Sequence, residues 1–264
     1  MPEVSKDSKC RRPLNKKQII YASAIVVGAI AIGVGLWIII GGYLEDATAR
    51  TEYDQLRTDF PAISENVDFD TVDEDEYENL PEALTEEDMH LRTLSLDELA
   101  AINNDFIGWI NIAGIISYPV VRGNDNDKYI NTTFTGAHNS AGAIFMDYRN
   151  TNNFDEFSKI IYGHHTRDGS MFAPLSRFLD SNFLRQNPDI TVTTRDGRTL
   201  TYRVFAAKVT DAWDPAYGIA LFDPARAAEE FPNAPANARG FMLLSTCTRS
   251  RDRDERILVF AALT

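Results

Sequence analysis

Residues 241–263 read FMLLSTCTRSRDRDERILVFAAL, and this stretch decides the fold more than any other. It holds two apolar runs, Phe241–Thr246 and Arg256–Leu263, separated by a turn crowded with arginines and acids. Short apolar runs bounded by polar clusters are typical of β-strands. We expect the two runs to pair antiparallel, which places Cys247 at the end of one strand and brings Arg256 close to its thiol.

Six further runs of this kind precede the pair: Trp109–Ile112, Tyr118–Val121, Ala143–Met146, Lys159–Tyr162, Ile190–Thr194 and Thr199–Val209. The last two are joined through Asp196-Gly197, a dipeptide typical of tight hairpins. Helices are expected after the Ser-x-x-Glu capping box at Ser95, over Met171–Leu179 and over Pro224–Glu230. Eight short strands without βαβ alternation predict a mainly β fold, either a barrel or a sandwich.

The net charge of −13 is unevenly distributed along the chain. Residues 1–17 carry six bases and two acids, whereas residues 45–90 carry seventeen acids and two arginines. The remainder, which holds the predicted strands, is therefore close to neutral. No broad basic stripe is evident, so nucleic acid is not an expected partner.

Residues 19–40 form a run of 22 residues without a charge, which as a helix would span about 33 Å and cross a bilayer. Bases precede this run and Glu45 and Asp46 follow it, so the N-terminus is expected in the cytoplasm and the rest outside the cell. A cleaved signal peptide ending near Ala47-Thr48-Ala49 is the weaker alternative, because its apolar region is usually shorter. The resulting domain prediction is a basic cytoplasmic tail (1–18), a single-pass transmembrane anchor (19–42), an acidic extracytoplasmic spacer (43–92) and a folded domain (93–264).

The two cysteines, Cys10 and Cys247, fall on opposite sides of the predicted anchor and cannot form a disulfide with each other. Cys247 is then either a buried apolar residue or a thiol kept for chemistry. A strand end is a good platform for a nucleophile, but a thiol with an ordinary pKa of about 8.5 needs a neighbouring base to attack efficiently at neutral pH.

Such a base is available at the end of another predicted strand, where His164 and His165 follow Gly163. A histidine can exchange protons with a thiol or an amine near neutral pH. Zinc binding is the weaker hypothesis, because the four histidines lack the usual ligand spacing. Arg256 is the candidate donor for an oxyanion.

These residues resemble the signatures of sortases. Tyr162-Gly163-His164, Leu244-Ser245-Thr246-Cys247 and an arginine at 256 before an apolar strand occur in that family's order. Further strings resemble class B sortases: Gly108-Trp109-Ile110, Tyr118-Pro119-Val120-Val121, residues 142–150 (GAIFMDYRN) and Asp168-Gly169-Ser170-Met171-Phe172. The resemblance covers about residues 107–263.

The resemblance implies an eight-stranded sortase-type β-barrel with an N-terminal helix and a helix-bearing insertion, Thr210–Arg239, before the cysteine strand. Cys247 would cleave a C-terminal sorting motif after its Thr and form a thioester, His164 would act as acid and base, and Arg256 would steady the substrate and the oxyanion. The substrate groove would include Tyr162, Ser245 and Thr246. The implied partners are surface proteins of a Gram-positive cell and an acceptor amine, from a cell-wall peptide or a pilin lysine, with no cofactor or metal.

Several alternatives remain open at the sequence level. Strand alternation turns His164 and His165 in opposite directions, so only one of them can face Cys247, and Arg253 competes with Arg256. A class B enzyme that polymerises pilins is an alternative to wall anchoring. A catalytically inactive surface scaffold on the same fold is another, whereas the order His before Cys argues against papain-like peptidases and the wide spacing against L,D-transpeptidases.

Overall fold

The computed structural model describes residues 16–64, 95–112, 114–187, 189–218, 225, 229–248, 250, 252 and 254–263. Residues 1–15 of the predicted basic tail, with Cys10, residues 65–92 of the predicted spacer and most of the predicted helix Pro224–Glu230 lie outside these residues. Contacts along the chain divide it into two units, Met1–Leu44 and Glu45–Thr264, which are described separately below.

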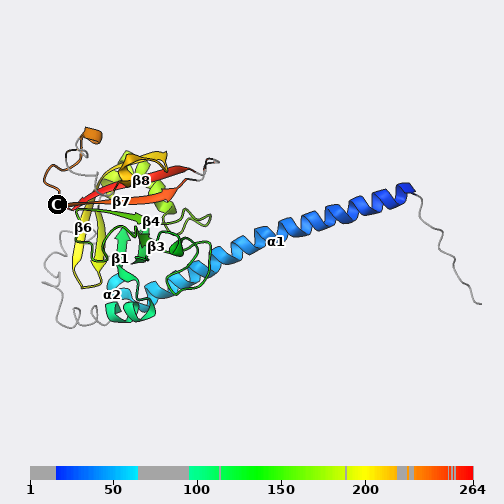
Figure 1. Ribbon diagram of the computed structural model, residues 1–264, viewed down its shortest axis with the longest axis horizontal. Helices are drawn as coiled ribbons and strands as arrows, with labels where there is room; N and C mark the ends of the chain where they lie inside the picture. The colour runs from blue at the N-terminus through cyan, green and yellow to red at the C-terminus, as the bar shows by residue number, and fades with distance from the viewer. Residues whose placement is uncertain are drawn as a thin grey trace, which may run out of the picture. The chain divides into compact units, whose positions relative to one another are not determined.

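Within the described part of the second unit, eight strands form a closed barrel in the order β1-β2-β3-β4-β7-β8-β6-β5 (Figure 1). They are β1 (Phe106–Ile112), β2 (Ile116–Val121), β3 (Ile144–Met146), β4 (Ser158–Tyr162), β5 (Asp189–Thr194), β6 (Thr199–Asp211), β7 (Gly240–Cys247) and β8 (Glu255–Leu263). Each corresponds to one of the predicted runs, and antiparallel pairing of β1 with β5 closes the barrel. The predicted eight-stranded barrel is confirmed.

Side chains of β7 alternate between two apolar cores. Met242 and Leu244 belong to the large core that fills the barrel. Phe241 and Leu243 point the other way, into a second core on the outside of the barrel that also includes Phe231 from the insertion. The period-two alternation of a strand therefore places Ser245 and Cys247 on the outer face, beside the insertion.

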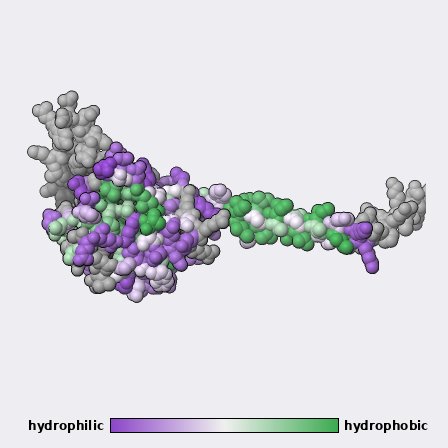
Figure 2. All heavy atoms as spheres, turned by 90° about the horizontal axis from the view of Figure 1, so that it is seen from above, coloured by the Kyte–Doolittle hydropathy of each residue, from purple (hydrophilic) through white to green (hydrophobic). Residues whose placement is uncertain are grey.

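The first unit is dominated by the N-terminal part of helix α1 (Lys16–Asp59). Among the described residues, this is the one helix long and apolar enough to cross a membrane. Its apolar side chains are exposed, and Figure 2 shows them as a continuous hydrophobic surface along the helix. An N-terminal apolar helix that could span a membrane is what the sequence predicts.

The C-terminal part of α1 corrects the prediction of a solvated spacer from residue 43. One stripe of α1 and of α2 (Pro61–Ser64) is buried in the barrel core: Ala49, Tyr53, Leu56, Phe60 and Ile63. These residues recur every three or four positions, while Glu45, Asp54 and Asp59 lie on the exposed face. The high average charge of this region conceals an amphipathic helix, and the compact unit begins at Glu45.

Hydrogen bonds join this helix to the barrel. The Tyr53 hydroxyl donates to the Gly142 carbonyl at 2.7 Å and accepts from the Phe134 amide at 3.2 Å. Arg57 donates to the Ser117 carbonyl at 2.9 Å, and the Asn111 side chain on β1 donates to the Ile63 carbonyl at 3.0 Å. Residues 45–63 are thus part of the folded unit.

The remaining helices are short. The helix predicted from the capping box covers residues 95–102 and buries Leu96, Leu99 and Ala100, although Ile102 is 46% exposed. The helix predicted over Met171–Leu179 is a 3-10 helix, η3 (Ala173–Leu179), followed by α4 (Ser181–Gln186), which the sequence analysis missed. Two further 3-10 turns, η2 (Lys128–Ile130) and η4 (Pro215–Tyr217), border the site described below.

Candidate functional site

The thiol of Cys247 is placed by the pairing of β7 with β8. Cys247 lies directly opposite Arg256 in this antiparallel pair. Directly opposed residues project from the same face of a sheet, with Cβ atoms about 5 Å apart. The pairing continues past the strand end, because the Thr248 amide donates to the Glu255 carbonyl at 3.3 Å. The end of β7 is therefore held firmly, and both side chains border the same cleft.

His164 follows β4, which runs parallel to β7. Gly163 connects β4 to His164, and only a glycine fits there. A Cβ at that position would lie 2.5 Å from Ile144 and 2.7 Å from Phe172. His164 Nε2 lies 2.7 Å from the Ile130 carbonyl oxygen on η2. A carbonyl only accepts hydrogen bonds, so Nε2 carries a proton, and Nδ1 is the ring nitrogen left for proton exchange.

His165 points to another part of the surface, as strand alternation predicts. Its Nδ1 lies 3.0 Å from the backbone carbonyl oxygen of Cys247, so this ring contacts the main chain of the cysteine strand. His165 borders a separate cavity with Thr248 and Ile257. The cleft at Cys247 is bordered by His164. Arg253, the competing arginine, lies outside the described residues.

The cleft has a volume of about 390 Å³. It is lined by residues of both cores, the insertion and two loops: Asn126, Ile130, Phe145, Tyr162, Gly163, His164, Ala212, Tyr217, Ser245, Thr246, Cys247 and Arg256. All six residues predicted for the site therefore border one cavity. Pockets of this size with a few convergent polar groups commonly bind small ligands or peptide segments.

The three predicted groove residues differ in their roles. Tyr162 and Ser245 are direct neighbours in the β4–β7 pair, and the Ser245 hydroxyl lies 2.8 Å from the hydroxyl of Tyr217. Thr246 is 2% exposed, and alternation along β7 turns its side chain toward the barrel interior. Its hydroxyl has no hydrogen-bond partner among the residues that the structure describes.

Sequence reasoning missed four lining residues outside the strands: Asn126, Ile130, Ala212 and Tyr217. Ile130 belongs to η2, whereas Ala212 and Tyr217 belong to the insertion. The family resemblance predicts the insertion, Thr210–Arg239, before the cysteine strand. The sequence contains no signal for which residues of the insertion turn toward the thiol.

Electrostatics at the cleft favour protonated tyrosines and an ionised carboxylate. Burial raises the pKa of Tyr217, and burial together with the charge of Asp147 holds the pKa of Tyr162 well above its usual value. Burial opposes ionisation of Asp147, but hydrogen bonds from Arg149, Tyr162 and Asn126 outweigh it and lower the pKa of this carboxyl. Across the described ranges, no three His, Cys, Asp or Glu side chains converge as metal ligands would.

Comparison with known proteins agrees with this geometry. A family model described as the Sortase domain matches residues 110–264. Sortase B of Listeria monocytogenes is 45% identical over 94 residues, which are 35% of this chain and 38% of that protein. Sortase B of Staphylococcus aureus is 29% identical over 177 residues, which are 67% of this chain and 64% of that protein. The matched regions thus cover less than two thirds of the length of either relative.

Solved structures are similar over a larger share of their own length. The S. aureus sortase B–substrate complex superposes with a TM-score of 0.64 and 25% identity, covering 84% of this chain and 98% of that one. A class B sortase of Streptococcus pyogenes involved in pilus biogenesis superposes with a TM-score of 0.57 and 28% identity, covering 64% of this chain and 97% of that one. Since the family model covers more than half of the chain and these relatives are all of class B, the protein belongs to the sortase family and is a class B sortase.

Proposed function

We propose that this class B sortase is a cysteine transpeptidase that joins sorting-signal proteins to an amine outside the cell. The observation that carries the proposal is that Cys247, His164 and Arg256, from three different segments, border one cleft. Each has the side-chain chemistry that acyl transfer needs: a nucleophile, an acid-base group and a cation for the oxyanion.

In the first half-reaction, the Cys247 thiol passes its proton to His164 and its sulfur attacks the carbonyl carbon of the Thr in the sorting motif. Arg256 stabilises the negative charge that develops on the carbonyl oxygen. His164 then returns the proton to the departing amine, the peptide bond breaks, and a thioester to Cys247 remains. The hydrogen bond from His164 Nε2 to the Ile130 carbonyl orients the ring, so Nδ1 is the atom that moves the proton.

In the second half-reaction, an amine attacks the thioester. His164 accepts the proton that the amine loses, the carbon–sulfur bond breaks, and the Cys247 thiol is regenerated. A new amide bond then links the surface protein to the acceptor. No net oxidation or reduction occurs, so the reaction needs no redox cofactor.

The apolar helix at the N-terminal end of the chain would anchor the enzyme in the cell membrane. The excess of bases before the apolar run and of acids after it supports a cytoplasmic N-terminus and an extracellular catalytic unit. Substrates that carry a sorting signal are exported, so this orientation places the cleft on the side where they arrive.

The acceptor is either a wall-peptide amine or a lysine of a pilin subunit. The pilin lysine is supported by similarity to the S. pyogenes class B sortase, which is involved in pilus biogenesis. A scaffold without activity is the remaining alternative. The presence of all three reactive groups at one cleft argues against it.

The test is a peptide assay with the full-length chain in detergent micelles, read by mass spectrometry of the products. We expect cleavage after Thr in at least one peptide from a panel of sorting motifs, and transfer to either triglycine or a lysine-bearing peptide. Cys247→Ala should abolish both products. Cleavage that persists in this variant would contradict the proposal, and the preferred amine would separate wall anchoring from pilin polymerisation.

A further inference from the structure

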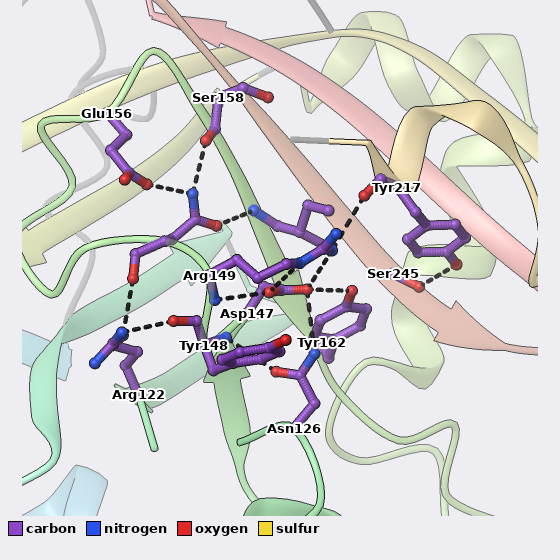
Figure 3. Close-up of polar contacts among 12 residues, drawn as sticks. Arg122, Asn126, Asp147, Tyr148, Arg149, Glu156, Ser158, Tyr162, Tyr217 and Ser245 are labelled. Carbon is purple, nitrogen blue, oxygen red and sulfur yellow. Dashed lines mark hydrogen bonds and ion pairs between the residues drawn. The ribbon is translucent and has the colours of Figure 1, made fainter. Parts of the chain in front are cut away.

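A buried carboxylate lies behind one wall of the cleft. Asp147, which directly follows β3, has no exposed surface. Its oxygens accept hydrogen bonds from the Tyr162 hydroxyl at 2.8 Å and from the Asn126 side chain at 3.2 Å. Both donors border the cleft, whereas Asp147 is absent from the described lining residues. The carboxylate thus fixes two cleft residues from behind (Figure 3).

Arg149 connects this carboxylate to the insertion. Its guanidinium donates to both Asp147 oxygens, from Nε at 2.8 Å and from Nη2 at 2.7 Å. The same Nη2 donates to the backbone carbonyl of Tyr217 on η4 at 3.1 Å. A planar guanidinium can make these contacts together because its donors have a fixed, fork-like geometry.

Tyr217 in turn closes a ring of contacts around the cleft wall. Its aromatic ring stacks on that of Tyr162, with centroids 6.3 Å apart and planes 15° from parallel. Its hydroxyl lies 2.8 Å from the hydroxyl of Ser245, two residues before the nucleophile. Figure 3 shows Arg149 lying between Asp147 and Tyr217, with Ser245 beside the hydroxyl of Tyr217.

Two features make this ring of contacts a source of rigidity at the cleft wall. A fully buried carboxylate is costly unless it is paired and hydrogen-bonded, and Asp147 has both kinds of partner. In contrast, η4 is a turn of only three residues, Pro215–Tyr217, in a long connection between β6 and β7. Such a short turn depends on contacts from elsewhere for its position, and Arg149 provides one of them.

We propose that Asp147 and Arg149 are positioning residues that hold Tyr217 and Tyr162 in place as the wall of the peptide-binding cleft. This inference rests on the proposed function, since it assigns the cleft to a sorting-motif peptide. Neither residue takes part in bond making or breaking. Their loss therefore weakens peptide binding and leaves the reactivity of Cys247 unchanged.

The test compares three variants of the full-length chain in detergent micelles. Arg149→Met removes the guanidinium contacts with Asp147 and with the Tyr217 carbonyl but keeps an unbranched side chain of similar length. The wild-type Arg149 side chain is 43% exposed. Arg149→Lys keeps the charge next to Asp147 but cannot reproduce the fork. Arg198→Met is the matched control, because Arg198 forms ion pairs with Asp155 and Asp196 and has a similarly exposed side chain.

Three quantities are measured for each variant: KM and kcat with the best-cleaved peptide, the rate at which iodoacetamide alkylates Cys247, and the thermal unfolding midpoint. We expect Arg149→Met to raise KM at least about fivefold, with kcat and the alkylation rate within about twofold of wild type. Arg149→Lys should fall between Arg149→Met and wild type, and Arg198→Met should leave KM unchanged.

An unchanged KM in Arg149→Met would overturn the positioning role and leave the transpeptidase assignment intact. A joint fall in kcat, alkylation rate and unfolding midpoint would also overturn it, because that pattern indicates a general structural role. Peptide affinity measured by fluorescence anisotropy in a Cys247→Ala background gives a second readout, and it should weaken by the same factor as KM rises. Failure of the wild-type chain to cleave any peptide would instead refute the proposed function itself.

Discussion

Cys247 and Arg256 face each other directly across the β7–β8 pair, each at the end of its strand nearest the turn. This register brings the two residues together by backbone hydrogen bonding, and the Arg256 guanidinium donates to the Glu255 carbonyl at 3.1 Å. The same face carries Ser245, and it adjoins the outer apolar core and the insertion. The chemistry of the site therefore depends on the alignment of two strands, which is among the most rigid features of a barrel.

Replacing Arg256 should lower kcat for the peptide much more than it lowers the rate at which a thiol reagent alkylates Cys247. We expect Arg256→Ala to lower kcat about 100-fold or more, because one preorganised donor to the oxyanion is lost. Iodoacetamide should still alkylate Cys247 at close to the wild-type rate, since that reaction forms no oxyanion. Arg256→Lys should recover part of the loss. Wild-type kcat in Arg256→Ala would exclude a role for this residue in the transition state.

The two adjacent histidines should differ sharply in steady-state kinetics. His164→Asn removes the acid-base group at the cleft and should lower kcat/KM by about 100-fold to 10,000-fold. His165→Asn removes a ring that contacts the Cys247 backbone carbonyl, and kcat/KM should fall by no more than about tenfold. The opposite ranking of the two variants would reverse the assignment of the acid-base residue.

Lys159 on β4 should cost the protein stability at neutral pH. Its side chain is 1% exposed, and burial lowers the pKa of its ammonium group to about 8. Because the folded pKa lies below the unfolded value, the penalty is complete below about pH 8 and disappears as the pH rises toward about 10.5. We expect Lys159→Met to raise the free energy of unfolding at pH 7 by about 1–3 kcal/mol in urea titrations.

The pH dependence provides the check on this explanation. The difference between Lys159→Met and wild type should shrink between pH 8 and pH 10. Tyr202→Phe serves as the control, because it removes the 3.2 Å hydrogen bond from Lys159 without removing the charge. That variant should be less stable than wild type. A Lys159→Met protein less stable than wild type at pH 7 would show that the ammonium contributes more than its burial costs.

The helix that precedes the barrel should be required for full stability. The Tyr53 hydroxyl is buried and joins the Gly142 carbonyl to the Phe134 amide. Tyr53→Phe leaves both groups without this partner and should lower the free energy of unfolding by about 1–3 kcal/mol. A chain that begins at residue 65 should lose more, since it also exposes the part of the core that Leu56 and Phe60 cover. Equal unfolding midpoints for chains that begin at residues 45 and 65 would contradict this role.

The strands could be predicted from the sequence because each is a short apolar run with turn residues at both ends. Cys247 and the histidine pair could be placed near strand ends for the same reason, whereas the choice of His164 over His165 rests on its place after Gly163 in the family motif. Strand alternation also explains why His164 and His165 lie on different sides. These features depend on local pattern and on pairing between neighbours.

Two other features depend on contacts that no local pattern reveals. The apolar stripe of Tyr53 and Leu56 lies within a strongly acidic region, so average charge obscured its helical spacing. Tyr217 comes from an insertion with little apolar pattern, and its place at the cleft follows from Arg149 and Ser245, which are distant in sequence. Only the folded structure brings these groups together.

Intact-protein mass spectrometry of the acyl-enzyme tests the central claim most directly. The full-length chain is mixed with a sorting-motif peptide without an acceptor amine and quenched in acid within seconds. We predict a mass increase equal to the peptide up to its Thr less one water, located at Cys247 by peptide mapping, released by hydroxylamine and absent in Cys247→Ala. Peptide turnover without any such adduct, or with an adduct that persists in Cys247→Ala, would contradict a thioester at Cys247.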